Sequence, residues 1–413
     1  MHYVLQNTSV NDAIFPRKQY KSKLNKNIKN KKRNTKTKKI KYYAKSNKLY
    51  LTLNNLIHYK NIFQHNRKID TTIILLKKIE FDIFYSGKRK YPLLVKELIT
   101  PLTGTTDPNE PPIDRRIIDD PFREDADIPT KYRHTLNDYE KLMAYGGSMG
   151  HNAPAGQHKT NMTIYSETFL LSNITPQEMV FNSGLWVIME NWCKQLGYNT
   201  NLKNITVFTG SIPDSKDVII NNYINTNINN TSTKNIKPTK MNIPLKMFKI
   251  ICFQKAGKPN VTYMEILIAN NAPYYIEPKI GKFDLNTYLI ATNSYNWFQN
   301  FSGINIDKLL KYYNFNTLNI KPFRYFINMS FNLSPSLKLL MKKSNWFGYL
   351  IYSNTIEELD NKWNECKLLE KEFQSIQFHK KYYEIVRNRL LDKISNNISN
   401  NMSNNMSNIF IKK

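Results

Sequence analysis

The stretch that decides the fold reads GGSMGHNAPAGQHKTNM over residues 146–162 and continues as ETFLLSNITPQEMVFNSGLWVIME over residues 167–190. His151 follows a glycine among small residues in the first part. Asn182 lies in the second part, just ahead of a run from Leu185 to Leu196 whose apolar residues recur at helical spacing, which predicts a helix. Taken singly, a histidine after glycine in a loop is usually a surface residue, and an asparagine at a helix start is usually an N-cap.

Strands are predicted on both sides of this stretch. Lys77–Tyr85 and Tyr91–Leu98 alternate apolar and polar residues around Ser86-Gly87-Lys88, which predicts a strand pair joined by a tight turn. A loop rich in Pro and Asp is expected between them and the quoted stretch, over residues 101–129. The further strands expected are Thr163–Ser172, Asn204–Thr209, Met247–Phe253 and Thr262–Ala269. Because strands and helices follow in no strict βαβ order, the sequence predicts an α+β fold with a largely antiparallel sheet.

The two ends of the chain differ from its middle in composition. Residues 1–50 contain fifteen Lys and Arg against the single acid Asp12, so half of the net charge of +28 lies there. We expect residues 1–70 to form a basic, mostly irregular arm with a short helix over residues 51–62. Thr355–Ile394 has apolar residues at steps of three and four among many charges, which predicts one long amphipathic helix. Residues 395–413 form a low-complexity tail, and residues 219–240 an Asn-rich surface excursion.

The positive charge of the N-terminal arm and the cysteine content limit the classes of protein to which this chain can belong. A cationic arm attracts polyanions through counterion release, so nucleic acid or an anionic membrane surface is favoured over a merely solvated arm. Three widely spaced cysteines without a CxxC pair argue against a structural zinc site and against a disulfide framework. No run reaches the roughly 18 apolar residues that a membrane helix needs. The protein is expected to be soluble or peripheral, in a reducing compartment.

The quoted stretch resembles the signature of the DNA/RNA non-specific endonucleases, the ββα-metal nucleases typified by endonuclease G. In that signature Asp-Arg-Gly-His precedes small residues, and SN-x-x-PQ leads into an Asn on the metal helix. The resemblance continues in the right order through YSGKRKYPLLVKEL (85–98), DDPFREDADIPTKYRHTLNDY (119–139), VFTGSIP (207–213), IPLKMFKI (243–250), IANNAP (268–273) and FSGINI (301–306). It implies a ββα-metal nuclease domain over residues 71–312, followed by a C-terminal helical extension over residues 313–394.

The resemblance also implies a site that cuts phosphodiesters. His151 occupies the position of the general base, a role that suits histidine because its ordinary pKa lies near neutrality. Asn182 occupies the position of the metal ligand, where one amide oxygen together with water can hold a hard cation, expected to be Mg²⁺. Glu190 resembles the carboxylate that orients metal-bound water. His134 and His158 are expected to be structural.

One dipeptide departs from the family pattern. Ser148-Met149 stands where the family has Asp-Arg. The family's arginine offers a forked cationic donor to the scissile phosphate, and a methionine can neither carry charge nor donate a hydrogen bond. Loss of one such contact typically lowers a rate by ~10²–10³. Arg123 resembles a second phosphate-facing arginine of the family, with a surface ion pair to Glu124 or Asp125 as the equal alternative.

Two functions are compatible with these residues. In the first, the nuclease site is impaired, and the chain is a basic nucleic-acid-binding or structural component of a large mitochondrial assembly such as the mitochondrial ribosome. In the second, it is an active magnesium-dependent DNA/RNA endonuclease that uses His151, Asn182 and Glu190, with Arg123 as the phosphate clamp. Nucleic acid is the expected partner, bound mainly by the basic arm, and the resemblance makes a homodimer conceivable. Trp186 and Trp192 are expected to be core residues rather than base-stacking platforms.

Overall fold

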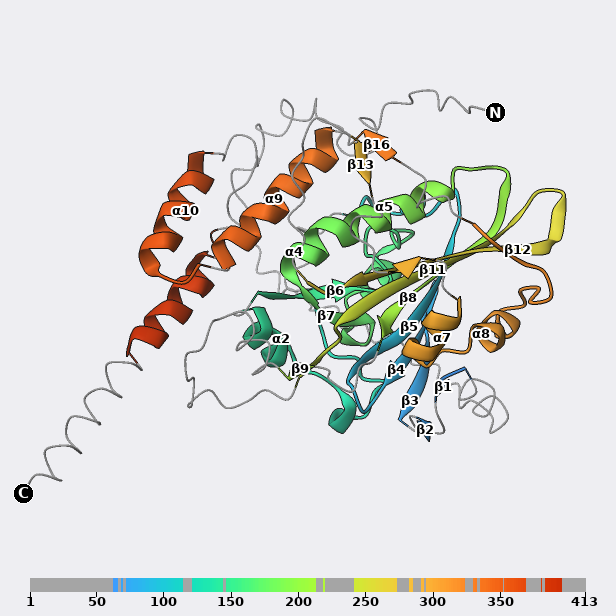
Figure 1. The fold of residues 1–413 in the computed structure, drawn as a ribbon, viewed down its shortest axis with the longest axis horizontal. Helices are drawn as coiled ribbons and strands as arrows, with labels where there is room; N and C mark the ends of the chain where they lie inside the picture. The colour runs from blue at the N-terminus through green and yellow to red at the C-terminus, as the bar shows by residue number, and fades with distance from the viewer. Residues whose placement is uncertain are drawn as a thin grey trace, which may run out of the picture. The chain divides into compact units, whose positions relative to one another are not determined.

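The computed structural model describes residues 62–65, 68–69, 72–113, 121–143, 146–212, 218–219, 241–272, 282–284, 291–292, 295–323, 330–332, 335–351, 353–368, 380 and 383–395 (Figure 1). Most of the basic arm, including all but the last residue of its predicted helix over residues 51–62, the excursion beyond Ile219 and nearly all of the predicted tail lie outside these residues. In the part that is described, no helix is long and apolar enough to cross a membrane.

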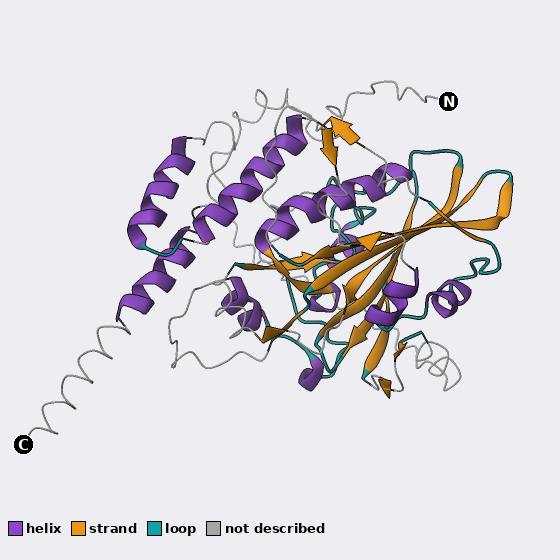
Figure 2. Ribbon diagram, in the orientation of Figure 1, coloured by secondary structure: helices purple, strands orange, loops and turns teal. Residues whose placement is uncertain are grey.

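An eight-stranded sheet forms the centre of the domain, with the strand order β14-β12-β11-β8-β5-β4-β3 and β15 beside β12. Neighbouring strands are antiparallel except for β12 and β15, which are parallel. The strands are β3 (Ile73–Lys77), β4 (Phe81–Ser86), β5 (Tyr91–Ile99), β8 (Leu202–Ile212), β11 (Lys246–Lys255), β12 (Lys258–Asn270), β14 (Ala291–Thr292) and β15 (Ile320–Pro322). The predicted α+β fold with a largely antiparallel sheet is therefore confirmed (Figure 2).

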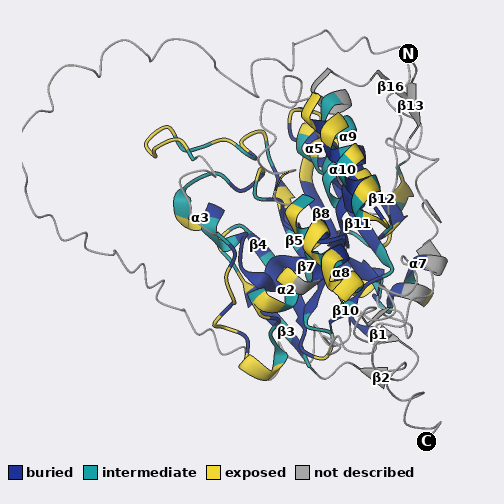
Figure 3. Cartoon of the chain, turned by 90° about the vertical axis from the view of Figure 1, so that its left-hand side faces the viewer, coloured by how far each residue is buried: buried dark blue, intermediate teal, exposed yellow. Residues whose placement is uncertain are grey.

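Helices cover both faces of this sheet, which explains why its central strands are apolar on both sides. On one face, α5 (Val187–Leu196) packs through Met189 and Trp192 against β8 and β11. On the other face, α7 (Tyr295–Ser302) and α8 (Ile306–Tyr312) pack through residues such as Phe298 and Leu309. The middle strands are accordingly buried, and Figure 3 shows them mostly in dark blue.

Short elements complete the described chain. They are β1 (Gln64–His65) paired with β2 (Lys68–Ile69), β9 (Val218–Ile219) with β10 (Asn242–Ile243), β13 (Lys282–Asp284) with β16 (Ser330–Asn332), the 3-10 turn Thr130–Tyr132 and α2 (Leu136–Met143). Ile62 and Phe63 are buried in the same apolar cluster as α8, and the Asn305 amide donates to the Ile62 carbonyl at 2.7 Å. These two residues of the predicted arm thus pack with the nuclease domain.

The predicted hairpin before the signature is confirmed, with one change at its start. Strands β4 and β5 pair around the turn at residues 87–90. However, Lys77 ends a separate strand, β3, which pairs with β4 across a turn at residues 78–80. The strands predicted within β8, β11 and β12 are also confirmed, and each extends a few residues further.

The strand predicted over Thr163–Ser172 is wrong. These residues form the short helix α3 (Met162–Glu167) and a 3-10 turn at Leu171–Asn173. The Asn161 side chain caps α3 by accepting a hydrogen bond from the Ile164 amide at 3.0 Å. This N-cap outweighs the β propensity of the threonine and isoleucine that follow, because it satisfies an amide that helix formation leaves without a partner.

The single long helix predicted over Thr355–Ile394 is wrong as well. The described residues form α10 (Ile356–Leu368) and a separate helical segment over residues 383–395, and a further helix, α9 (Pro335–Ile351), precedes them. The Trp363 and Tyr383 rings stack with centroids 4.9 Å apart, and the Tyr383 hydroxyl donates to Asp360 at 2.7 Å. In one straight helix, residues twenty positions apart would lie about 30 Å apart. Residues 356–368 and 383–395 therefore do not belong to one straight helix.

Candidate active site

Two short strands and a helix frame the predicted site. Strand β6 (Gly147–His151) pairs antiparallel with β7 (Ile174–Glu178), so that His151 lies opposite Ile174. Directly after β7 come a single helical turn, α4 (Met179–Phe181), a π-helical turn, η5 (Asn182–Trp186), and then α5. The arrangement of two strands and a helix around His151 and Asn182 matches the expected ββα unit (Figure 1).

The start of the helix is tied to the large sheet by Asn271, in the IANNAP segment. Its side-chain oxygen accepts from the Glu178 amide at 2.7 Å, and its amide group donates to the carbonyls of Pro176 and Pro244 at 3.0 and 2.8 Å. The Glu178 carboxylate in turn caps the helix by accepting from the Phe181 amide at 2.6 Å. Asn271 is 7% exposed and therefore acts from within the core to fix where the metal helix begins.

His151 lies between two aromatic rings at the end of β6. Its ring centroid is 5.4 Å from that of Phe122 and 5.1 Å from that of Phe169. Its backbone carbonyl accepts a long hydrogen bond, 3.4 Å, from the indole nitrogen of Trp186. Trp186 is four residues beyond Asn182, so this contact brings His151 and the turn that begins at Asn182 together. Both Trp186 and Trp192 are buried, as predicted for core residues.

Two buried asparagines hold the loop after His151. The Asn152 amide donates to the Asn173 carbonyl and to the Thr175 hydroxyl, both at 2.9 Å. Asn173 accepts from the Ala153 amide at 2.9 Å and donates to the carbonyls of Ala153 and Thr168, also at 2.9 Å. The sequence prediction did not assign either residue a role. The sequence signal for this pair was that each asparagine belongs to a family motif, His151-Asn152 in the first and Ser172-Asn173 in the second.

Asn182 is the first residue of the π-helical turn and is partly exposed. Within the described residues its side chain has no hydrogen-bond partner, and a π turn of this kind often marks a functional site. No group of three or more His, Cys, Asp or Glu able to hold a metal occurs in the described chain. The amide oxygen of Asn182 is a donor that suits a hard divalent cation which keeps most of its water.

Glu190 as a whole residue is partly exposed, but its carboxyl group is desolvated. Burial raises the pKa of Glu190 to about 8, with the Lys249 ammonium opposing the rise and the Glu97 carboxylate adding to it. Its backbone carbonyl accepts from the Gln157 side chain at 2.9 Å. Among the described residues, no hydrogen bond joins its carboxyl group to His151 or Asn182. At neutral pH the isolated site thus holds Glu190 mostly as a neutral acid.

Arg123 is engaged with Ser166 in this structure. Its guanidinium donates to the Ser166 carbonyl at 2.8 Å and to the Ser166 hydroxyl at 3.3 Å. The alternative ion pairs are wrong, because Glu124 pairs with Arg133 at 3.4 Å and Asp125 with Lys78 at 2.9 Å. The backbone of Arg123 nevertheless bridges to Leu170, which places it beside the two aromatic neighbours of His151.

Ser148 and Met149, which stand where the family has Asp-Arg, lie on opposite faces of β6, because successive residues of a strand point to opposite sides. Met149 shares the face of His151 and packs against the apolar cluster that contains Phe122 and Phe169. Ser148 lies on the other face, buried, and its hydroxyl donates to the Gln177 carbonyl at 3.2 Å. The Gln177 side chain is 1% exposed, and neither its amide nitrogen nor its oxygen has a partner among the described residues.

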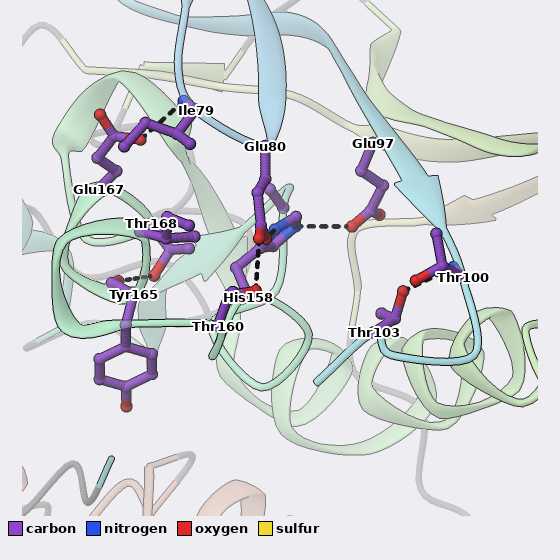
Figure 4. Close-up of polar contacts among 12 residues, drawn as sticks. Ile79, Glu80, Glu97, Thr100, Thr103, His158, Thr160, Tyr165, Glu167 and Thr168 are labelled. Atoms are coloured by element: carbon purple, nitrogen blue, oxygen red, sulfur yellow. Dashed lines mark hydrogen bonds and ion pairs between the residues drawn. The ribbon is translucent and has the colours of Figure 1, made fainter. Parts of the chain in front are cut away.

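His158, in the loop that follows β6, is held between two carboxylates (Figure 4). Its ring nitrogens lie 2.8 Å from Glu80 and 3.1 Å from Glu97. Burial alone lowers the pKa of His158, but the hydrogen bonds and charges of the two glutamates outweigh it and raise this pKa to about 9. An imidazolium clamped in this way has a structural role, as predicted, and is not available as a base at neutral pH.

The segment of residues 122–125 (FRED) is bound, through Asp125, to the elements that carry the site. Asp125 is 3% exposed, forms an ion pair with Lys78 at 2.9 Å and accepts from the Ser172 hydroxyl at 2.5 Å. The segment before the site, the first hairpin and the SN motif therefore meet at one buried carboxylate. This explains why motifs so far apart in the sequence occur together.

Comparisons with known proteins agree with this geometry. The sequence profile of the DNA/RNA non-specific endonuclease family matches residues 58–312. The mitochondrial nuclease EXOG of Danio rerio is 29% identical over 165 residues, 40% of this chain and 45% of the relative. The mitochondrial nuclease of Saccharomyces cerevisiae is 30% identical over 169 residues, 40% of this chain and 48% of the relative. This chain thus spans about half the length of the curated relatives it matches.

A solved structure of the complex of EndoG with EndoGI gives a TM-score of 0.43 at 18% identity, covering 60% of this chain and 90% of that chain. The family profile takes in more than half of the sequence and includes the β6, β7 and α5 unit with His151 and Asn182. On that match, the chain belongs to the DNA/RNA non-specific endonuclease family.

Proposed function

We propose that this protein is a mitochondrial nucleic-acid-binding nuclease whose metal-dependent cleavage of phosphodiester bonds is impaired at positions 148 and 149. The observation that carries the proposal is the environment of Met149. It shares the face of His151 on β6, so an arginine there would project toward the scissile phosphate, but the methionine packs into the apolar cluster instead. The second candidate arginine, Arg123, is engaged with Ser166.

The residues that remain support the first steps of the reaction. His151 is oriented by its two aromatic neighbours and is suited to take a proton from the attacking water. Asn182 would hold a divalent cation such as Mg²⁺, which supplies positive charge where the transition state gathers negative charge. Glu190, neutral near pH 7 in the isolated site, would need to lose its proton to act as the carboxylate that orients water. Met149 cannot stabilise the negative charge that develops on the phosphate, as an arginine at this position would.

A plasmid-nicking assay on the full chain with Mg²⁺ tests the proposal. We expect weak nicking by the wild type and a gain of about 10²-fold in Met149→Arg, since one preorganised cationic contact typically contributes that much. Adding His151→Ala to Met149→Arg should abolish the gain. If the wild type already cuts as fast as Met149→Arg, the site is not impaired and the proposal fails.

The second candidate function is an active non-specific DNA/RNA endonuclease. It is favoured by the intact frame, because Asn152, Asn173 and Asn271 hold His151 and the metal helix in place. In this case Arg123 would have to leave Ser166 when nucleic acid binds. Arg123→Lys separates the two functions. In an active enzyme that relies on the guanidinium fork, it should slow cleavage about tenfold or more.

The cellular setting is proposed on two grounds. Relatives from a fish and from yeast carry the word mitochondrial in their names, and the net charge of +28 suits a polyanionic partner. We extend the proposal to membership of a large mitochondrial assembly, with the C-terminal helices as a docking element. Sedimentation of a mitochondrial lysate at moderate salt should place the protein with a large complex. A free monomer or homodimer in that experiment would exclude the assembly.

A further inference from the structure

A row of buried polar side chains crosses the sheet directly beneath α5. Glu97 on β5 pairs with Val207, Thr209 on β8 pairs with Lys249 on β11, and Glu265 on β12 pairs with Ile251. Paired residues share a face, and Val207 and Ile251 belong to the apolar cluster that packs against α5. The four polar residues therefore lie on the α5 face of four neighbouring strands, and all four are at most 1% exposed.

Lys249 is the member of this row that contacts the Trp186 ring. Its ammonium donates to the Thr209 hydroxyl at 2.9 Å and lies 4.7 Å from the centroid of the Trp186 ring. Burial of an ammonium is costly, and one hydroxyl does not replace its water shell. The ring face of a tryptophan recovers part of that cost, since a desolvated cation–π contact contributes about 2 kcal/mol.

Trp186 connects this cation to the site. Its indole nitrogen donates to the His151 carbonyl at 3.4 Å, and it ends the π-helical turn that begins at Asn182. One face of the Trp186 ring therefore contacts the Lys249 ammonium. Its indole nitrogen binds the backbone at the end of β6, where His151, the proposed general base, lies. We propose that Lys249 is a positioning residue: it fixes the Trp186 indole and, through it, the relation between His151 and the Asn182 turn. The inference rests on the proposed site but not on its rate of cleavage.

The test is NMR of the full chain, in which the five tryptophan indole signals can be assigned with Trp186→Phe and Trp192→Phe. We expect Lys249→Met to speed solvent exchange of the Trp186 indole hydrogen about thirtyfold, because tenfold corresponds to about 1.4 kcal/mol and the lost cation–π contact to about 2 kcal/mol. Trp192 lies six residues further along the same helix and should keep its protection. The His151 ring signal, assigned with His151→Ala, should move toward its position in Trp186→Phe. In the double variant it should move no further, since the two residues act as one unit.

Two further variants keep the test sharp. Cys252→Ala removes a buried side chain from the same strand but the opposite face, so it should leave the ratio of the two indole exchange rates unchanged. Thr209→Val removes the hydroxyl beneath Lys249 with little change in volume and should produce a smaller shift in the same direction. Equal acceleration at Trp186 and Trp192, or an unmoved His151 signal, would overturn the proposal. These signals require no cleavage, so their outcome is independent of the nicking assay.

Discussion

His151 ends strand β6 and His158 lies in the loop that follows it, seven residues further on, in opposite surroundings. His151 stands between the rings of Phe122 and Phe169, whereas His158 is clamped by Glu80 and Glu97 and holds its proton up to a pKa of about 9. The ring of His158 is therefore charged at neutral pH and is not available as a base. The difference teaches that the partners of a histidine, rather than its place in a motif, decide whether it can act as a base.

The largest expected change in stability concerns His158, the structural histidine of this pair. His158→Gln should lower the free energy of unfolding by about 3 kcal/mol, because it leaves the buried Glu97 carboxylate without its cation. His151→Gln is the matched control and should lower it by about 1 kcal/mol, since the ring of His151 lies between two neutral aromatic side chains. Urea unfolding of both variants measures this. Equal losses would show that the two histidines are equally structural.

A second prediction concerns how stability depends on pH. The pKa of His158 is raised from 6.5 to about 9, so the stability that its proton contributes is complete below pH 6.5 and is lost as the pH rises through 9. The pKa of Glu190 is also raised, from 4.5 to about 8, so its contribution is complete below pH 4.5 and is lost by pH 8. The free energy of unfolding should therefore fall with rising pH across both windows.

Two variants separate these windows. Glu190→Gln should remove the part of the fall that begins below pH 6.5, and His158→Gln should remove the part that extends above pH 8. Denaturant unfolding at a series of pH values gives the slopes. If Glu190→Gln leaves the slope below pH 6.5 unchanged, Glu190 is ionised in the folded protein and is closer to its predicted carboxylate role.

The third prediction compares the glycines that precede the two histidines. A Cβ atom on Gly150 would lie 2.1 Å from Cδ of the buried Gln177, whereas a Cβ on Gly156 would meet nothing within 4 Å. Gly150→Ala should therefore cost about 2 kcal/mol of unfolding free energy by overpacking, and Gly156→Ala should be close to neutral. Thermal unfolding tests this. A neutral Gly150→Ala would show that the strand next to His151 has room to shift.

The smallest expected change in unfolding free energy concerns Gln177, whose side chain lies against Gly150. Both polar atoms of the Gln177 side chain are buried without a partner among the described residues, so Gln177→Leu should raise the unfolding free energy by about 1 kcal/mol. Gln157→Leu is the control, because Gln157 donates to the Glu190 carbonyl and its loss should destabilise by a similar amount. In a Ser148→Asp background the gain at Gln177 should vanish, since the introduced carboxylate would accept from its amide. A gain that persists there would mean that the introduced carboxylate and Gln177 do not interact.

The sequence determined the frame of this protein because that frame follows from local patterns. Alternation of apolar residues marked the first hairpin and the strands within β8, β11 and β12, and helical spacing marked residues 185–196. The ordered motifs identified the family and placed His151 and Asn182 on one ββα unit. Local patterns misled where a single side chain reversed the preference, as when Asn161 capped a helix over residues predicted to be a strand.

Only the tertiary structure decided the chemistry around these residues, because their partners come from elsewhere in the chain. Ser166 engages Arg123, and two distant glutamates hold the charge of His158. Lys249 lies on the other side of the signature from the first hairpin, yet it supports Trp186 and opposes the rise in the pKa of Glu190. Burial and charge depend on which strands meet under the helix, and no spacing within the sequence encodes that meeting. The sequence therefore predicted which residues form the site, and the tertiary structure decided their partners, their burial and the pKa values of His158 and Glu190.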